Sequence, residues 1–149
     1  MIAIGCDHAA LNLKNAVRDH LTERGLEVKD FGIYEVGEKC DYPDMAATVA
    51  HFVRDGSAEL GILICGTGVG MSVTANKVRG IRACCCSDVF SAKMCRAHNN
   101  ANILTFGERV VGPGLALELV DAFLATEFEG GRHARRVDLI SKVEEEENR

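Results

Sequence analysis

A glycine-rich stretch near the middle of the chain constrains the fold more than any other feature. An apolar run ends at Cys65, glycines then occupy every second position from Gly66 to Gly70, and apolar residues follow at three- and four-residue spacing. The run predicts a buried strand and the spacing predicts a helix that stops at Gly80, so the glycines lie at a strand-to-helix turn. Glycine lets the backbone approach a ligand, and unpaired amide groups at a helix start attract anions. The stretch therefore predicts an anion-binding turn with a thiol at its mouth.

Three familiar phosphate-binding motifs do not fit this turn. A dinucleotide fingerprint needs glycine where the chain has Met71, and a P-loop needs Gly-Lys-Ser/Thr where the chain reads Gly66-Thr67-Gly68. A phosphatase loop would place arginine at the position of Met71. The glycines could also do no more than relieve crowding between the strand and the helix. The functional alternative is an anion cradle beside a thiol, which suits a small phosphorylated or enolate-forming substrate.

Strand-like and helical segments alternate along the chain. Period-two and continuous apolar runs predict five strands, at residues 1–6, 26–31, 62–64, 81–85 and 101–106. Helices of this length between strands indicate right-handed crossovers and a parallel sheet covered by helices on both faces. After a break at Gly130-Gly131, one further helix has a narrow apolar stripe that could dock on a second subunit. We expect an α/β fold with one domain spanning residues 1–149.

The order of the predicted elements also places a ligand site. In an open parallel sheet, ligands bind outside the carboxyl ends of the strands. Asp7 and His8 follow the first strand, Cys65 to Gly70 follow the third, and another loop follows the fifth. We therefore expect these three segments to meet in one crevice.

Composition excludes several classes of protein. The net charge is −5 and the 17 Lys and Arg residues are mostly dispersed, which argues against nucleic-acid binding. Seven cysteines without a C-x-x-C pair suggest neither a disulfide framework nor a zinc site, and they indicate a reducing compartment. The chain starts in a strand with no leader, and the uncharged stretch at 60–76 is rich in glycine and polar residues. We expect a cytoplasmic protein that does not bind membranes.

Six ordered motifs cover nearly the whole chain. They are GCDHAA at 5–10, CDYPD at 40–44, GILICGTGVGMSVTANKV at 61–78, GIRA at 80–83, AHNNANILTFGERVVG at 97–112 and EGGRHARRV at 129–137. Together they closely resemble the ribose-5-phosphate isomerase B family, which includes galactose-6-phosphate and allose-6-phosphate isomerases. The resemblance implies a Rossmann-like αβα sandwich and aldose–ketose isomerisation through an enediol, without a metal or another cofactor. It also implies a homodimer or a tetramer with its sites at the subunit interface.

The resemblance further implies a role for each matching residue. Cys65 would move the proton between C1 and C2, and His98 would open the sugar ring. Some relatives instead carry a glutamate in the glycine turn, where this chain has Val69, so the chain resembles the cysteine type. The residues implied to bind substrate and phosphate are Asp7, His8, Gly66, Thr67, Gly68, Val69, Gly70, Asn99, Arg109, Arg132 and Arg136. Tyr42 could cover the substrate or only pack its loop.

The chemistry of the thiol adds one structural requirement. A free thiol is mostly protonated at neutral pH, and half-ionisation requires roughly 2 kcal/mol of thiolate stabilisation. A helix terminus typically supplies about 0.3 to 1 kcal/mol, and up to ~2 kcal/mol in partly buried geometry, so the helix dipole alone is barely enough. We therefore expect N–H groups of the glycine turn to hydrogen-bond the sulfur or the enediolate as well. The alternative is that Cys65 is simply a small buried hydrophobic residue.

The other candidate residues also have purely structural alternatives. His98 could cap the end of a helix, and Asp7 with His8 could cap the start of the first one. Arg132 and Arg136 share a helical face and could bind one phosphate. Alternatively, Arg135 and Arg136 could pair with Glu144 to Glu147 or with nearby carboxylates. Two histidines, His20 and His51, are expected on the surface, and His133 is ambiguous. Cys6, Cys84, Cys85, Cys86 and Cys95 are interpreted as packing residues.

Three functions remain open from the sequence. Ribose 5-phosphate and ribulose 5-phosphate are the best-supported substrate pair. An isomerase of a six-carbon sugar phosphate differs by about one hydroxymethyl group, a small energetic difference that residue types do not resolve. A phosphate-ligand sensor would use the same cradle and arginines without needing Cys65 or His98. We assign no function to the acidic tail.

Overall fold

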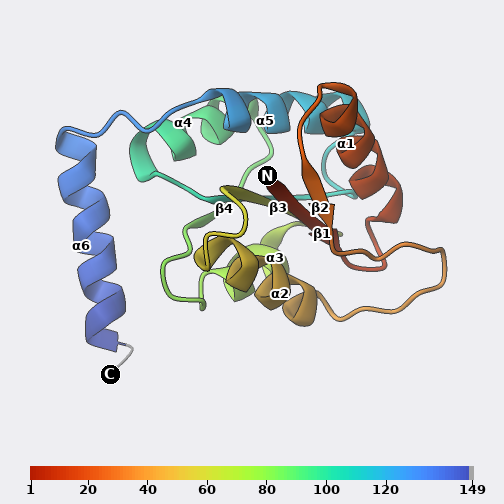
Figure 1. Cartoon of the computed structure of the whole chain (residues 1–149), viewed down its shortest axis with the longest axis horizontal. Helices are drawn as coiled ribbons and strands as arrows, with labels where there is room; N and C mark the ends of the chain where they lie inside the picture. Colours follow the sequence, from red (N-terminus) through yellow and green to blue (C-terminus); the bar gives the residue numbers. More distant parts are fainter. Residues whose placement is uncertain (148–149) are drawn as a thin grey trace.

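The structure, a computed structural model, describes residues 1–147 (Figure 1). Asn148 and Arg149, the last two residues of the predicted domain, lie outside the described residues. The elements along the chain are β1 (Ile2–Cys6), α1 (Leu11–Glu23), β2 (Val28–Asp30), α2 (Tyr42–Arg54), β3 (Leu60–Cys65), α3 (Val69–Ala75), β4 (Ala83–Cys85), α4 (Val89–Asn99), β5 (Ile103–Gly107), α5 (Pro113–Ala125) and α6 (Arg132–Glu147).

The five strands form one parallel sheet in the order β2-β1-β3-β5-β4, which confirms the prediction from the alternating pattern. The three central strands are almost completely buried, whereas the edge strands β2 and β4 have three residues each and are shorter than expected. An edge strand has only one neighbour to pair with, so fewer of its residues enter the ladder. The longest strand, β3, lies at the centre of the sheet, and Cys65 is its last residue.

Helices cover both faces of this sheet (Figure 1). The helices α1, α4 and α5 lie on one face, and α2 with α3 lies on the other. Successive residues of β3 face opposite layers: Ile62 and Ile64 pack with the first group, and Leu63 and Cys65 pack with the second. The result is the three-layer αβα sandwich that the sequence predicts.

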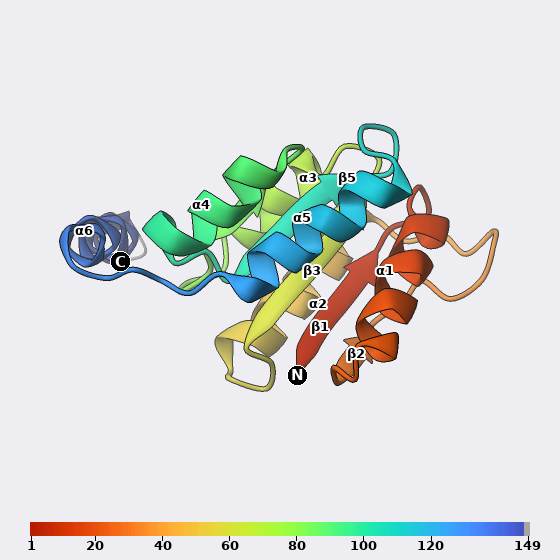
Figure 2. The ribbon, with the colours of Figure 1, turned by 90° about the horizontal axis from the view of Figure 1, so that it is seen from above.

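The last helix, α6, stands apart from the sandwich (Figures 1 and 2). Only His133 and Val137 of this helix are buried, whereas Leu139, Ile140 and Val143 are about half exposed. Its apolar stripe is therefore mostly uncovered by the rest of the chain.

Two local predictions were wrong. The helix after the glycine turn was expected to reach Gly80 but ends at Ala75, because the Asn76 side chain turns back to bond both backbone groups of Ala83, at 2.8 and 2.9 Å. Cys85 was interpreted as a packing residue, yet it is exposed at the end of an edge strand. By contrast Cys6 is fully buried, and that burial raises the pKa of its thiol to about 12.

None of the helices in residues 1–147 combines the length and apolar character needed to span a bilayer.

Candidate active site

A cleft of about 560 Å³ opens at the carboxyl ends of β1 and β3. Its walls combine the segment after β1, the start of α2, the glycine turn after β3 and the loop after β5. The lining residues are Asp7, His8, Ala9, Tyr42, Cys65, Gly66, Thr67, Val69, Gly70, Val73 and Arg109. The three segments that the sequence places at this edge of the sheet therefore do meet in one cleft.

The thiol of Cys65 lies at the base of this cleft. Cys65 is the last residue of β3 and only 5% exposed, yet it lines the cleft wall. The Gly68 N–H donates a hydrogen bond to its Sγ over 3.0 Å. The backbone amide is the donor in this bond and the sulfur is the acceptor. The sequence predicts this hydrogen bond from the glycine turn to the sulfur.

The glycine turn owes its shape to two close approaches. Gly68 has φ +81°, and a Cβ there would lie 2.6 Å from the Cα of Phe106. A Cβ on Gly70 would lie 2.7 Å from the Tyr42 ring. Gly66 has no such conflict, since its nearest neighbour would be Arg109 at 3.4 Å. Two of the glycines therefore do relieve crowding, and the same crowding holds the Gly68 amide against the sulfur.

Three polar side chains line the same cleft as Cys65. Asp7 is buried, and its carboxylate accepts the Ala9 N–H at 2.9 Å, so it shapes the turn before α1 instead of capping the helix itself. His8 is exposed, with Nδ1 3.2 Å from the Cys40 carbonyl oxygen. Arg109 is exposed beside Gly66, and its backbone N–H donates to the Gly66 carbonyl at 3.1 Å. An imidazole and a guanidinium therefore border the same cleft as the thiol.

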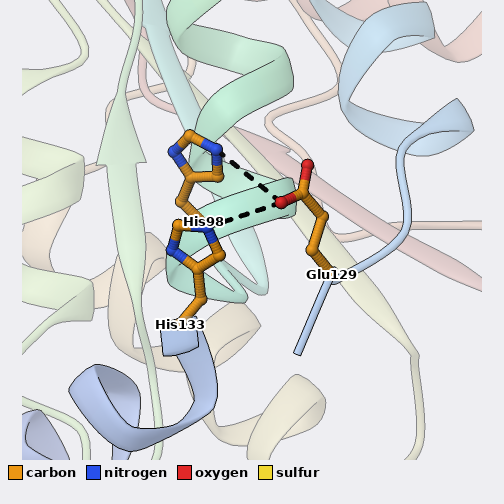
Figure 3. A group of neighbouring side chains, drawn as sticks. All are labelled: His98, Glu129 and His133. Carbon is orange, nitrogen blue, oxygen red and sulfur yellow. Dashed lines mark ion pairs between the residues drawn. The ribbon is translucent and has the colours of Figure 1, made fainter. Parts of the chain in front are cut away.

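A second polar group, formed by His98, Glu129 and His133, lies elsewhere (Figure 3). The two imidazole rings stack 4.2 Å apart and nearly parallel. Both Nε2 atoms face one Glu129 oxygen, at 4.0 Å from His98 and 3.4 Å from His133. Burial lowers the pKa of His133, and His98 and Arg132 lower it further.

The elements that carry this second group meet at the amino ends of the parallel strands, which we call the amino edge of the sheet. His98 lies in the last turn of α4, and His133 lies in the first turn of α6. The segment between α5 and α6 is tied to α4, because the Glu129 N–H donates to the Ala97 carbonyl at 3.0 Å. Arg132 and Arg136 are exposed on α6 beside this group, and within residues 1–147 neither forms an ion pair.

Within one chain the two polar groups lie at opposite ends of the parallel strands. The helix α4 runs from the carboxyl end of β4 back to the amino end of β5, so His98 and Asn99 lie near the amino edge. The five residues of β5 between the two edges span roughly 16 Å. The structure therefore brings Cys65 together with Asp7, His8, Tyr42 and Arg109, but not with His98, Asn99, Arg132 or Arg136.

Sequence reasoning missed part of both groups. Val73 lines the cleft one turn beyond the glycines, at a position that its apolar character made indistinguishable from core. Glu129 was not singled out, and His133 was left ambiguous. The available signal was their four-residue separation across Gly130-Gly131, which brings the two side chains together at the start of α6.

Comparison with known proteins gives one consistent result. The family model described as Ribose/Galactose Isomerase matches residues 2–140. Ribose-5-phosphate isomerase B of Escherichia coli is 51% identical over 147 residues, covering 99% of this chain and 98% of the relative. D-erythrulose-4-phosphate isomerase of Pectobacterium atrosepticum is 49% identical over 146 residues, covering 98% and 96%.

A solved structure gives the same result for the fold. Ribose-5-phosphate isomerase B from Mycoplasma genitalium, with bound ribulose 5-phosphate, superposes with a TM-score of 0.93 at 43% identity. The alignment covers 97% of this chain and 96% of the other. The arrangement of strands and helices around the cleft is therefore shared with a protein that holds a five-carbon sugar phosphate.

Proposed function

The chain belongs to the ribose/galactose isomerase family, and we propose that it interconverts ribose 5-phosphate and ribulose 5-phosphate through an enediol. One observation carries the chemistry: the Cys65 sulfur lines the cleft and accepts the Gly68 N–H at 3.0 Å. A buried cysteine that only packed would not need to meet both a cleft and an amide donor.

The proposed reaction uses the thiolate as a base. Cys65 removes the proton from C2 of the open-chain aldose while the C1 carbonyl oxygen gains a proton, which gives the enediol. The same sulfur then returns a proton to C1 as the C2 hydroxyl loses its own, which leaves the ketose. Charge develops on the oxygens during both transfers, and amide donors of the Gly66–Gly70 turn are positioned to stabilise it.

We propose that a second copy of the chain completes each site. The cleft lacks His98, Asn99, Arg132 and Arg136, because they lie at the other edge of the same sheet. The apolar stripe of α6, which includes Leu139 and Val143, is also uncovered within the chain. A twofold dimer that buries this stripe would carry the amino-edge group of one chain to the cleft of the other.

In this arrangement the partner's residues act on the ends of the sugar phosphate. His98 of the second copy donates a proton to the ring oxygen and so opens the cyclic sugar. Arg132 and Arg136 hold the phosphate together with Arg109 of the first copy, because each guanidinium group can donate two parallel hydrogen bonds to phosphate oxygens. Asp7, His8, Tyr42 and Asn99 contact the sugar hydroxyls.

One similar relative is named for a substrate with one carbon fewer. The relatives named for ribose 5-phosphate and for D-erythrulose 4-phosphate are 51% and 49% identical to this chain, so overall identity favours neither. The five-carbon substrate is preferred because the structurally similar Mycoplasma genitalium protein holds ribulose 5-phosphate.

A substrate panel tests the proposal. The purified chain should convert ribose 5-phosphate faster than the four-carbon substrate D-erythrulose 4-phosphate or the six-carbon substrates allose and galactose 6-phosphate. In deuterated water it should place deuterium on C1 of the ketose product. The Cys65→Ala variant, purified in the same way, controls for host isomerases. Binding of ribose 5-phosphate without turnover would instead indicate a phosphate-ligand sensor.

A further inference from the structure

The group formed by His98, Glu129 and His133 has a feature that an ordinary hydrogen-bonded pair lacks. His133 is only 7% exposed, and its Nε2 is buried without a hydrogen-bond partner in the described part of the chain. That nitrogen faces the Glu129 carboxylate at 3.4 Å, too far and too poorly aligned for a good hydrogen bond (Figure 3). A buried polar atom left in this state costs free energy unless a ligand satisfies it.

The spacing of the three ligand atoms is close to that of a metal site. Metal–nitrogen and metal–oxygen bonds of about 2.0 to 2.2 Å place neighbouring ligands of a tetrahedral zinc ion roughly 3.3 Å apart. The His133 Nε2 to Glu129 oxygen distance is 3.4 Å, and all three ligand atoms lie within 4.8 Å of one another. An ion lies in the plane of each imidazole that binds it, so the two stacked rings do not point at one ion as they stand. His133 is fixed by burial, whereas the side chains of His98 and Glu129 are 38% and 56% exposed, so metal binding requires the His98 ring to turn out of the stack and Glu129 to follow.

We propose that His98, Glu129 and His133 bind a divalent transition-metal ion of the zinc class, and that the bound ion inhibits the isomerase. Inhibition follows because a metal on the His98 Nε2 removes the group that would protonate the sugar ring oxygen. This second part rests on the function proposed above. The first part depends only on the three side chains of one chain.

The chemistry of the ligands selects the ion. Two imidazoles and one carboxylate suit zinc, copper or nickel, whereas magnesium and calcium prefer oxygen ligands alone. Arg132 and Arg136 add positive charge next to His133 and oppose any cation. We therefore expect a reversible regulatory site that fills when zinc is available, and not a permanently loaded structural site.

Titration of the full-length protein with zinc chloride, by calorimetry after treatment with a chelator, tests the site. About one zinc ion per chain should bind, and Glu129→Gln and His133→Asn should each weaken that binding by at least about tenfold. His51→Asn is the matched control, because His51 is an exposed histidine on α2 outside the group. Circular dichroism confirms that each variant is folded.

Cobalt distinguishes this group from the seven cysteines. Cobalt bound by the proposed ligands should give visible absorption without sulfur-to-cobalt charge-transfer bands, and Glu129→Gln should abolish that absorption. Sulfur bands, or zinc binding that is equal in wild type, Glu129→Gln and His133→Asn, would overturn the site.

Activity then tests the inhibition, measured for each variant relative to its own rate with chelator. Zinc should inhibit wild type and His51→Asn, and Glu129→Gln should require at least about tenfold more zinc. Stoichiometric zinc binding without inhibition would overturn the inhibitory part alone. A chain inactive on every sugar phosphate would instead overturn the proposed isomerase, and the zinc titration would still decide whether the site exists.

Discussion

The polar side chains at the carboxyl ends of the strands (the carboxyl edge) and at their amino ends (the amino edge) are held in different ways. At the carboxyl edge, the backbone fixes the Cys65 thiol, with the Gly68 amide 3.0 Å away and pressed against β5. At the amino edge, His98 and Glu129 are partly exposed, and α6 buries only two residues against the rest of the chain. The comparison indicates that one chain by itself fixes the thiol that we propose transfers the proton. In the proposed dimer, the other half of the site lies where α6 would pack against a second copy.

Loss of the thiol should have the largest effect on this comparison. Cys65→Ala should lower kcat about 10³-fold, within the range that a positioned general base supplies, while substrate affinity and the free energy of unfolding change little. Steady-state kinetics and substrate binding by calorimetry separate the two effects. A variant that retained most of its turnover would remove Cys65 from the mechanism.

The glycine turn offers a matched pair of substitutions. Gly68→Ala should destabilise the protein by roughly 2 to 4 kcal/mol and lower kcat, because a Cβ at φ +81° would lie 2.6 Å from the Phe106 backbone. Gly66→Ala should be mild in both respects, since its Cβ meets only Arg109 at 3.4 Å. Chemical denaturation and kcat measure the contrast. Equal effects at both positions would show that the amide is not held by crowding.

A substitution at the amino edge should affect one form of the substrate selectively. His98→Asn should slow turnover of cyclic ribose 5-phosphate about 10²-fold and leave an open-chain analogue nearly unaffected, because only the ring needs the acid. The His51→Asn variant provides the control. Equal losses on both substrates would contradict a ring-opening role.

The smallest effect concerns how α6 is held. The Gly80 N–H donates to the Glu144 carboxylate at 3.0 Å, and Arg79 lies 3.8 Å from Glu145. Glu144→Ala should lower the free energy of unfolding by about 0.5 to 1 kcal/mol, whereas the exposed Glu146→Ala should change it less. Thermal unfolding at low and high salt measures the difference. A larger loss in Glu146→Ala would show that the acidic tail does not tether α6 through Glu144.

The sequence predicted the fold better than the site. Alternating strand and helix patterns were sufficient for the parallel sheet, and the order of segments brought Asp7 and Cys65 into one cleft. Local contacts then changed the details: the Asn76 side chain ended α3 early, and the edge position of β4 left Cys85 exposed. The four-residue separation of Glu129 and His133 did not by itself predict their contact, because the contact also depends on how α6 begins after two glycines with positive φ.

Mixing two inactive variants tests the division of the site most directly. Cys65→Ala chains and His98→Asn chains are unfolded and refolded together, then assayed on ribose 5-phosphate. If each site combines Cys65 of one copy with His98 of the other, half of the dimers regain one intact site, and activity returns to about a quarter of wild type. If both residues act within the same copy, every site retains one defect. No recovery in verified mixed dimers would contradict the account.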